Sequence, residues 1–281
     1  MYEIVFKEEL NPVTKLFEVR APAEARKAQA GQFVIVRVDD KGERIPLTVA
    51  DYDRERATIS LVVQEVGKTT MHMGSLQVGD RLASFTGPLG LPTEIQRYGT
   101  VLCVGGGFAI APICAIARAL RKAGNHVVSI VGARTRELLF WEDRVRSASD
   151  ELIICTDDGS YGRQGLVTQP LQEMLEAGRS IDHAWAIGPA IMMKFCCLAT
   201  QPYGVPTTVS LNSIMVDGTG MCGACRVEVG GQTRFACVDG PEFDAHQVNW
   251  DLMLARQQFY LEEEKLALER WRHRCQLEAG G

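Results

Sequence analysis

The sequence predicts a β + α/β chain made of an antiparallel β-barrel, a parallel α/β domain and a small cysteine-bearing domain with a C-terminal helix. Three observations lead to this prediction. Short β-rich segments fill the first third, apolar strands then alternate with helices, and closely spaced cysteines follow in a glycine-rich loop. We expect the units to span residues 1–97, 98–201, 202–245 and 246–281, the last being the helix.

Composition favours an ordinary globular protein. Hydrophobic residues make up 46% of the 281 residues, charged residues make up 23%, and the formal net charge is −5. This charge gives no reason to expect nucleic-acid or membrane binding, and no apolar run reaches the roughly 18 residues of a membrane span. The N-terminal stretch MYEIVFKEELNP lacks the regions of a signal peptide, so we expect a cytoplasmic protein.

The first unit is predicted from its strands. YEIVFKEEL, TKLFEVRAP, QFVIVRV and ATISLVVQEV are short, β-rich and punctuated by glycine or proline. No long helical pattern lies between them, which favours a small antiparallel barrel. The turn cluster GPLGLP closes this unit.

The second unit alternates strands and helices. Residues 99–135 show an apolar strand, a glycine turn, a helix and a second strand, which together make one βαβ unit. Further strands are expected in ELIICTDDGSYG and HAWAI, and further helices in GLVTQPLQEMLEAG and AIMMKFCCLAT. Continuous apolar strands alternating with helices indicate a parallel sheet covered on both faces.

The third unit begins with a short strand and a cysteine loop, and CRVEVGGQTRFAC then reads as a hairpin. The remaining residues, 246–281, are helical and highly charged, with apolar residues at helical intervals. This helix either packs back on the chain or faces a partner.

The cysteines divide into two groups. Five of the nine lie in apolar segments and are expected to be buried thiols: Cys103, Cys114, Cys155, Cys196 and Cys197. Without a secretion signal, a disulfide framework is not expected, and clustered cysteines more often bind metal.

The other group has metal-ligand spacing. The spacing C-x2-C-x11-C is formed by Cys222, Cys225 and Cys237. It is compatible with a fragment of a zinc ribbon or with an iron–sulfur loop, and it can also arise by chance. Aligned with the plant-type 2Fe–2S loop, C-x4-C-x2-C with a distant cysteine, the first position falls on Asp217. A carboxylate is anionic, so it can bind the iron in the position that a thiolate would otherwise take. Alternatively Asp217 only starts a turn, and water or Cys275 supplies the fourth ligand.

Together with the cysteine loop, the segments RIPLTVADYD, GKTTMHMGSLQVGD, CVGGGFAIAPI, CTDDGS and GPAIMM resemble the ferredoxin–NADP reductase superfamily. Within it, the whole chain is similar to electron-transfer subunits of class-B dihydroorotate dehydrogenase. It is also similar to the small subunits of the electron-bifurcating NADH-dependent ferredoxin:NADP oxidoreductase, also known as sulfide dehydrogenase. The resemblance implies three cofactors, namely FAD, a 2Fe–2S cluster and NAD(H).

The resemblance also implies which residues bind the flavin. An R-x-[YF]-[ST] strand holds the flavin in that superfamily, and a G-x-x-[ST] turn at a helix start holds its pyrophosphate. The turn corresponds to Gly67, Lys68, Thr69 and Thr70. The strand departs from the pattern, because Ile45 stands at the arginine position. The adjacent Arg44 is therefore the candidate ligand of the flavin phosphate, although neighbouring residues of a strand face opposite ways, and Pro46, Leu47 and Thr48 are expected to line the ring. Without the resemblance both segments would read as an ordinary strand and turn.

The nucleotide contacts are expected at the ends of the parallel strands. Gly105, Gly106 and Gly107 lie between an apolar strand and a helix, where they permit close approach of a nicotinamide nucleotide. The resemblance adds Arg134, Asp157, Asp158, Gly188 and Pro189, although the two aspartates also suit a loop cap. Arg134 and Arg136 suit a 2′-phosphate, whereas the family comparison favours NAD(H).

The resemblance implies an NAD(P)H-dependent flavin and iron–sulfur oxidoreductase subunit. It would pass electrons through FAD and the cluster to a large subunit with its own FAD and 4Fe–4S clusters. Through the large subunit, that hetero-oligomer would exchange electrons with ferredoxin and NADP(H), which are therefore indirect partners of this chain. The alternatives are an electron-transfer subunit of dihydroorotate dehydrogenase, a diaphorase module of a hydrogenase or sulfur-reducing complex, and a zinc-bearing non-redox scaffold subunit. No general acid or base is expected in this chain.

Overall fold

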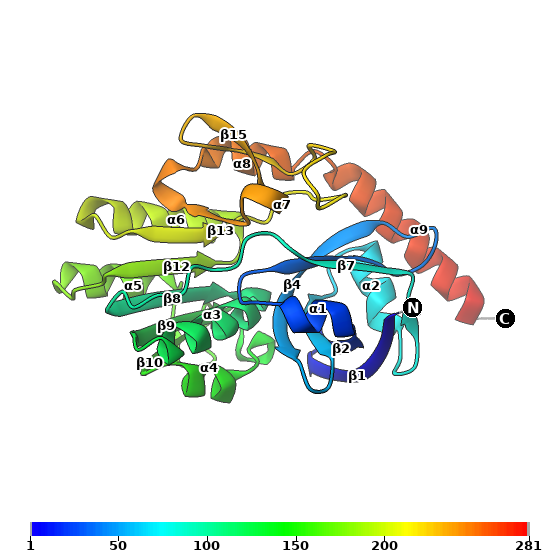
Figure 1. The fold of residues 1–281 in the computed structure, drawn as a ribbon, viewed down its shortest axis with the longest axis horizontal. Helices are drawn as coiled ribbons and strands as arrows, with labels where there is room; N and C mark the ends of the chain where they lie inside the picture. Colours follow the sequence, from blue (N-terminus) through cyan, green and yellow to red (C-terminus); the bar gives the residue numbers. More distant parts are fainter. Residues whose placement is uncertain (1, 280–281) are drawn as a thin grey trace.

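The computed structural model describes residues 2–279 of the chain, with side-chain surroundings up to residue 273. Figure 1 shows a barrel and a parallel sheet side by side, with the cysteine-bearing segment above the sheet and the C-terminal helix along the outside. Within the described residues, none of the helices combines the length and apolar character that a membrane span requires.

The predicted barrel strands are confirmed. A seven-stranded antiparallel sheet, ordered β6-β1-β2-β5-β4-β3-β7, curves into a nearly closed barrel. Its strands are β1 Tyr2–Asn11, β2 Thr14–Arg20, β3 Phe33–Arg37, β4 Arg44–Asp53, β5 Thr58–Gln64, β6 Arg81–Leu82 and β7 Ser84–Leu89. Helices α1 Pro22–Lys27 and α2 Lys68–Ser75 connect them. The inward residues of these strands form a separate apolar core, because alternate residues of a strand face the same side.

The second sheet also follows the prediction. Its order is β11-β10-β9-β8-β12-β13-β16, parallel except for β16. The strands before the cysteine-bearing segment are β8 Thr100–Gly106, β9 His126–Ala133, β10 Glu151–Thr156, β11 Arg163–Gln164 and β12 His183–Ile187. The helices are α3 Ile110–Lys122, α4 Glu142–Ala148, α5 Thr168–Glu176 and α6 Ala190–Thr200, with short turns η1 Gly107–Ala109, η2 Arg136–Leu138 and η3 Gln201–Tyr203.

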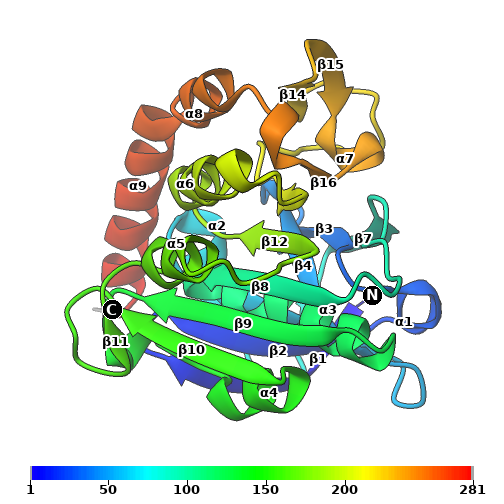
Figure 2. The ribbon, with the colours of Figure 1, turned by 90° about the vertical axis from the view of Figure 1, so that its left-hand side faces the viewer.

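Helices cover both faces of this sheet, as Figure 2 shows. Apolar residues of α3 and α4 pack on one face, and those of α5 and α6 pack on the other. Such a sheet has buried strands on both sides, which explains their continuous apolar runs. Strand order reverses between β8 and β12, and ligands of such sheets bind outside the carboxyl ends of the strands at that point.

The last part of the chain returns to the same sheet. Its elements are β13 Thr207–Ser210, β14 Arg226–Val229, β15 Gln232–Phe235, α7 Ala236–Asp239, β16 Glu242–Asp244, η4 Ala245–Gln247, α8 Trp250–Gln257 and α9 Leu261–Ala279. β14 and β15 form the expected hairpin. β13 and β16 extend the parallel sheet although both lie beyond residue 201, so the predicted domain division stays a prediction.

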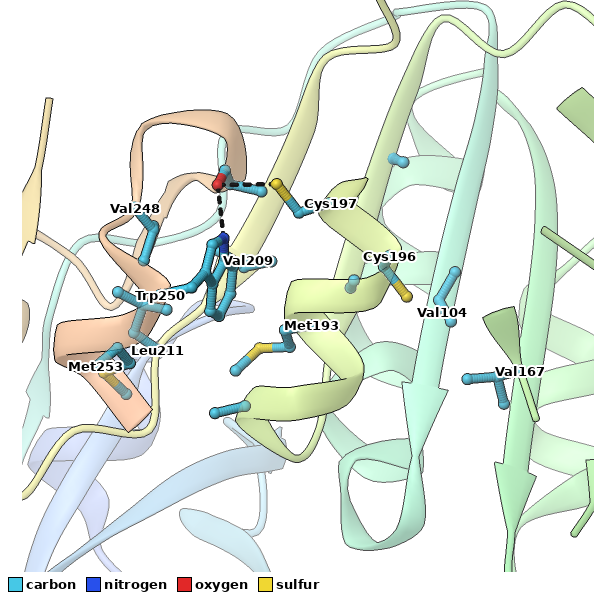
Figure 3. Close-up of a cluster of buried hydrophobic side chains, with 14 of the residues drawn as sticks. Val104, Val167, Met193, Cys196, Cys197, Val209, Leu211, Val248, Trp250 and Met253 are labelled. Carbon is cyan, nitrogen blue, oxygen red and sulfur yellow. Dashed lines mark hydrogen bonds between the residues drawn. The ribbon is translucent and has the colours of Figure 1, made fainter. Parts of the chain in front are cut away.

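Helix α8 packs against α6 through the apolar core that covers this face of the parallel sheet, part of which is shown in Figure 3. Met193 and Cys197 of α6 lie opposite Trp250 and Met253 of α8. The Trp250 indole Nε1–H and the Cys197 thiol both donate to the backbone oxygen of Ala245, each at 3.1 Å. Helix α9 then contacts α2 of the barrel, while most of its described residues stay exposed, so the structure leaves the choice between the two expectations for this helix open.

Candidate functional site

An open cleft lies where the barrel, the parallel sheet and the cysteine-bearing segment meet. Its walls come from all three parts and include five of the sixteen predicted cofactor residues. The lining residues are Phe33, Pro46, Leu47, Thr48, Ala50, Val62, Gln64, Val66 and Thr70 of the barrel, Phe108, Ala111, Pro112, Ile187 and Gly188 of the sheet, and Ser210, Leu211, Asn212, Ser213, Met215 and Pro241. A mostly apolar cleft with a few polar groups suits a flat cofactor such as a flavin.

Strand β4 supplies the barrel wall of the cleft. Pro46, Leu47 and Thr48 all line it and pair with β3. Arg44 starts the same strand but is not among the lining residues. Its guanidinium donates to the backbone oxygens of Val216, at 2.8 Å, and Asp217, at 3.2 Å.

Helix α2 begins at the edge of the same cleft. Gly67 is its N-cap, and the Thr70 hydroxyl accepts the backbone N–H groups of Val66 and Gly67, each at 3.0 Å. The first-turn amides of a helix have no acceptor within the helix and carry partial positive charge, so this turn suits a pyrophosphate. Thr70 lines the cleft, which links this turn to the β4 residues.

Lys68 and Thr69 share a partner that the sequence did not point to. The Glu43 carboxylate accepts a hydrogen bond from the Lys68 ammonium at 3.1 Å and another from the Thr69 hydroxyl. Burial raises the pKa of Glu43, but the hydrogen bonds from Thr69 and Lys68 outweigh it and leave the pKa below its ordinary value. Glu43 precedes β4 by one residue, and no motif in the sequence marks it.

The glycine edges of β8 and β12 lie side by side. A Cβ on Gly188 would come within 3.3 Å of the Gly106 amide nitrogen, and a Cβ on Gly106 would come within 3.4 Å of Pro189. Gly107 has a positive φ of 60° and leads into α3. The predicted residues at these two strand ends are therefore brought together at the point where strand order reverses.

Arg134, Asp157 and Asp158 follow β9 and β10 at the same edge of the sheet and do not line the cleft. The backbone N–H groups of Asp157 and Asp158 donate to the oxygens of Ala133 and Arg134, and all three predicted side chains are exposed. The Ser160 hydroxyl and amide donate to Asp158 and lower its pKa. Asp158 is thus a loop cap.

Two of the four predicted cluster ligands are in contact: Cys225 at the end of the cysteine loop (residues 215–225) and Cys237 in α7. The sulfur atoms of Cys225 and Cys237 are 3.2 Å apart, and both residues are buried. Cys222 is exposed. The Asp217 carboxylate accepts hydrogen bonds from the Thr219 backbone N–H, at 3.2 Å, and from the Thr219 hydroxyl. Among the described residues, no group of three or more His, Cys, Asp and Glu side chains is arranged to hold a metal ion.

The backbone of this loop nevertheless fits a cluster. Gly218, Gly220 and Gly223 have φ values of 83°, 82° and 67°, a region that favours glycine and lets the chain wrap closely. The backbone N–H groups of Ala224 and Asp217 hold the pKa of Cys222 below its usual value. Amides aimed at a sulfur stabilise the thiolate that binds iron.

The other described cysteines are buried thiols, as predicted. Burial raises the pKa of Cys114 and Cys155 to about 11 and that of Cys196 to about 12, which makes these thiols poor nucleophiles. The side chain of Cys275, the alternative fourth ligand, lies outside the described residues. Residues 210–213 and Met215 line the cleft without having been predicted, because the stretch that follows β13 carries no motif.

Two family models match parts of the chain. The oxidoreductase FAD-binding domain matches residues 1–93, which include β4 and α2. The iron–sulfur cluster binding domain of dihydroorotate dehydrogenase B matches residues 212–249, which include the cysteine loop. The two matches support the flavin and cluster predictions for these parts of the chain.

Similar proteins cover nearly the whole chain. The dihydroorotate dehydrogenase B (NAD(+)) electron transfer subunit homolog of Thermotoga maritima is 49% identical over 269 residues, 96% of this chain and 95% of the relative. The dihydroorotate dehydrogenase B (NAD(+)) electron transfer subunit of Geobacillus thermodenitrificans is 35% identical over 80% of this chain and 88% of the relative.

A solved structure has the same fold throughout. It comes from work on flavin-based electron bifurcation via the NADH-dependent reduced ferredoxin–NADP oxidoreductase. It superposes with a TM-score of 0.91 at 48% identity, over 96% of this chain and 98% of that chain. The predicted resemblance is thus confirmed, and the chain belongs to the family of dihydroorotate dehydrogenase B electron-transfer subunits and their homologues, with a ferredoxin reductase-like fold.

Proposed function

We propose that this chain is an electron-transfer flavoprotein subunit that passes electrons between NAD(H), FAD and a 2Fe–2S cluster, and onward to a larger subunit. The observation that carries the proposal is the shared cleft. Its walls are β4, the carboxyl end of β12 and the segment that leads into the cysteine loop. A flavin held there would lie between a nucleotide at the sheet edge and a cluster in the loop.

The three cofactors complement one another chemically. A nicotinamide exchanges electrons in pairs and a 2Fe–2S cluster exchanges them singly, and a flavin supplies chemistry that serves both. The residues of the chain bind and orient these groups. We assign Pro46, Leu47 and Thr48 to the flavin ring, the first turn of α2 to its pyrophosphate, and the glycine edges of β8 and β12 to the nucleotide.

The cysteine loop gives the proposed exit for electrons. Cys222 is exposed, and its neighbour Met221 is 89% exposed. Val216 and Val238 are also exposed apolar residues. An exposed apolar rim around a redox centre suits contact with another protein. We propose a large partner with its own FAD and 4Fe–4S clusters, which would serve ferredoxin and NADP(H), as in the electron-bifurcating oxidoreductase.

A second candidate function is supported by the relatives' names. Several relatives are electron transfer subunits of dihydroorotate dehydrogenase B, so that enzyme is the alternative partner. Asp217 counts against it, because in the aligned loop a carboxylate stands where the plant-type pattern has its first cysteine. Reconstitution with a dihydroorotate dehydrogenase catalytic subunit tests this alternative: NADH formation from NAD(+) and dihydroorotate would favour it.

Cofactor analysis tests the main proposal. We expect the anaerobically purified chain to contain about one FAD and two irons, to absorb near 450 nm and to reduce artificial dyes with NADH, without bifurcation on its own. Zinc without flavin would instead indicate the scaffold alternative. A chain that holds both cofactors but does not accept electrons from NADH or NADPH would refute the nucleotide part of the proposal.

A further inference from the structure

The start of the cysteine loop packs directly on the barrel. Met215 is buried and lines the cleft. Gly218 lies so close to the barrel that a Cβ on it would come within 2.8 Å of Ile35 and 2.7 Å of Leu89. Ile35 belongs to β3 and Leu89 to β7, so the loop backbone rests on two strands of the flavin-binding barrel.

Arg44 holds the two residues between these contacts. Its Nε donates to the Val216 oxygen at 2.8 Å and its Nη2 donates to the Asp217 oxygen at 3.2 Å. A guanidinium is planar and offers its donors in a fixed fork, so two bonds to neighbouring oxygens fix direction as well as distance. Arg44 thus connects β4 to the backbone of a predicted cluster ligand.

The same strand also shapes the flavin side of the cleft. Pro46, Leu47 and Thr48 line it, and they follow Arg44 by two to four residues on β4. The guanidinium is engaged by the loop and lies outside the lining of the cleft. A single rigid strand therefore contacts both the proposed flavin position and the loop that carries Asp217 and Cys222.

We propose that Arg44 is a positioning residue that fixes the cysteine loop relative to the flavin cleft. It would set the separation and orientation between flavin and cluster, and it would not bind the flavin phosphate. This inference rests on the proposed function. It replaces the flavin contact that the resemblance implied for Arg44 with a contact to the cluster loop.

The test compares Arg44→Ala and Arg44→Lys with Arg37→Ala in the purified chain carrying its cofactors. Arg37 lies directly opposite Arg44 on β3 and donates to Asp40 in its own hairpin, so it is a matched control. FAD, iron and sulfide per chain are measured first. The electron paramagnetic resonance spectrum of the reduced cluster and stopped-flow reduction of flavin and cluster by NADH follow.

We expect Arg44→Ala to keep its FAD and its flavin reduction within about twofold, while cluster reduction slows at least about tenfold or the cluster spectrum broadens, because small misplacements have large effects on reaction rates. The rate of cluster reduction in Arg44→Lys should lie between those of Arg44→Ala and the unmodified chain, since an ammonium lacks the fixed fork of donors. Arg37→Ala should match the unmodified chain.

Two results would overturn the inference. Loss of FAD with a normal cluster spectrum would make Arg44 a flavin ligand, and unchanged cluster reduction and spectrum would remove the positioning role. If Arg44→Ala does not fold, Arg44→Lys decides between these outcomes by the same measurements. Failure of the proposed function is separate, because it would show as missing flavin or iron in the unmodified chain.

Discussion

Gly218 shows at the scale of one residue how the cysteine loop depends on the barrel. Its φ of 83° favours glycine, and a Cβ would also meet Leu89 and Ile35. Gly231, in the β14–β15 hairpin, has a similar φ of 71°, but a Cβ added there would meet no atom within 4 Å. The two glycines therefore separate the cost of backbone strain from the cost of the lost close contact.

We predict that Gly218→Ala destabilises the chain by about 1–3 kcal/mol more than Gly231→Ala, because it adds an overlap to the same backbone strain. The iron content of Gly218→Ala should also fall. Chemical unfolding and iron analysis of both variants check this. Equal effects on stability and iron would mean that the contact with the barrel does not hold the loop.

Asp217 is the residue on which the identity of the cluster site depends. We predict that Asp217→Ala retains FAD but changes the spectrum of the reduced cluster, and that Asp217→Cys shifts it in a different way, because a thiolate donates more charge to iron. Thr219→Val is the control, since it removes the hydroxyl that donates to Asp217 while keeping the carboxylate. An Asp217→Ala chain with an unaltered cluster would move the fourth ligand elsewhere.

At the scale of elements, the first turn of α2 has two roles: it caps the helix, and it is the proposed binding site of the flavin pyrophosphate. Thr70 accepts two backbone N–H groups and lines the cleft. We predict that Thr70→Val lowers the free energy of unfolding by about 1 kcal/mol, as for loss of a cap, and weakens FAD binding severalfold. Unfolding and FAD titration of the flavin-free chain provide the measurements.

Ser75→Ala is the matched control for this helix. The Ser75 hydroxyl donates to the backbone oxygen of His72 at the opposite end of α2, and Ser75 is exposed. Its FAD affinity should be unchanged. If both variants bind FAD equally well, the turn of α2 is a structural cap and the pyrophosphate lies elsewhere.

Sequence patterns predicted the elements well because each depends on local periodicity. Short β-rich runs bounded by turn residues indicated β1, β2, β3 and β5, and the change to helical spacing indicated α3, α5 and α6. The partners across the fold could not be predicted this way. Glu43 contacts α2, and β16 pairs with β13, through contacts between segments far apart in the sequence. Arg44 is the clearest case, because its motif suggested a phosphate, whereas its fold neighbours are the carbonyls of residues 216 and 217.

At the scale of the whole molecule, Glu242 links the parts of the chain. Lying on β16, it accepts the Thr93 hydroxyl at 2.6 Å from the segment between barrel and sheet, and the Trp185 indole N–H at 3.3 Å from β12. Cys103 and Tyr98 are titratable groups close enough to feel its charge. Burial raises the pKa of Glu242 to about 7, although both hydrogen bonds act in the opposite direction.

This pKa makes the stability of the assembled fold depend on pH. The folded chain keeps the Glu242 proton up to about pH 7, whereas the unfolded chain releases it near 4.5, so the folded state binds more protons between these values. The contribution of Glu242 is therefore fully present below pH 4.5 and is lost as the pH rises through 7. The loss between pH 5.5 and 8 should amount to about 2 kcal/mol.

Glu242→Gln tests this, because the amide has nearly the same shape and does not titrate. The free energy of unfolding of the variant, relative to the unmodified chain, should rise by about 2 kcal/mol from pH 5.5 to pH 8. Glu173→Gln is the control, since Arg163 holds the pKa of Glu173 below its ordinary value and the carboxylate is ionised throughout this range. Parallel curves for Glu242→Gln and the unmodified chain would mean that Glu242 is already ionised in the folded molecule, and that the parts of the fold are joined through a charged carboxylate.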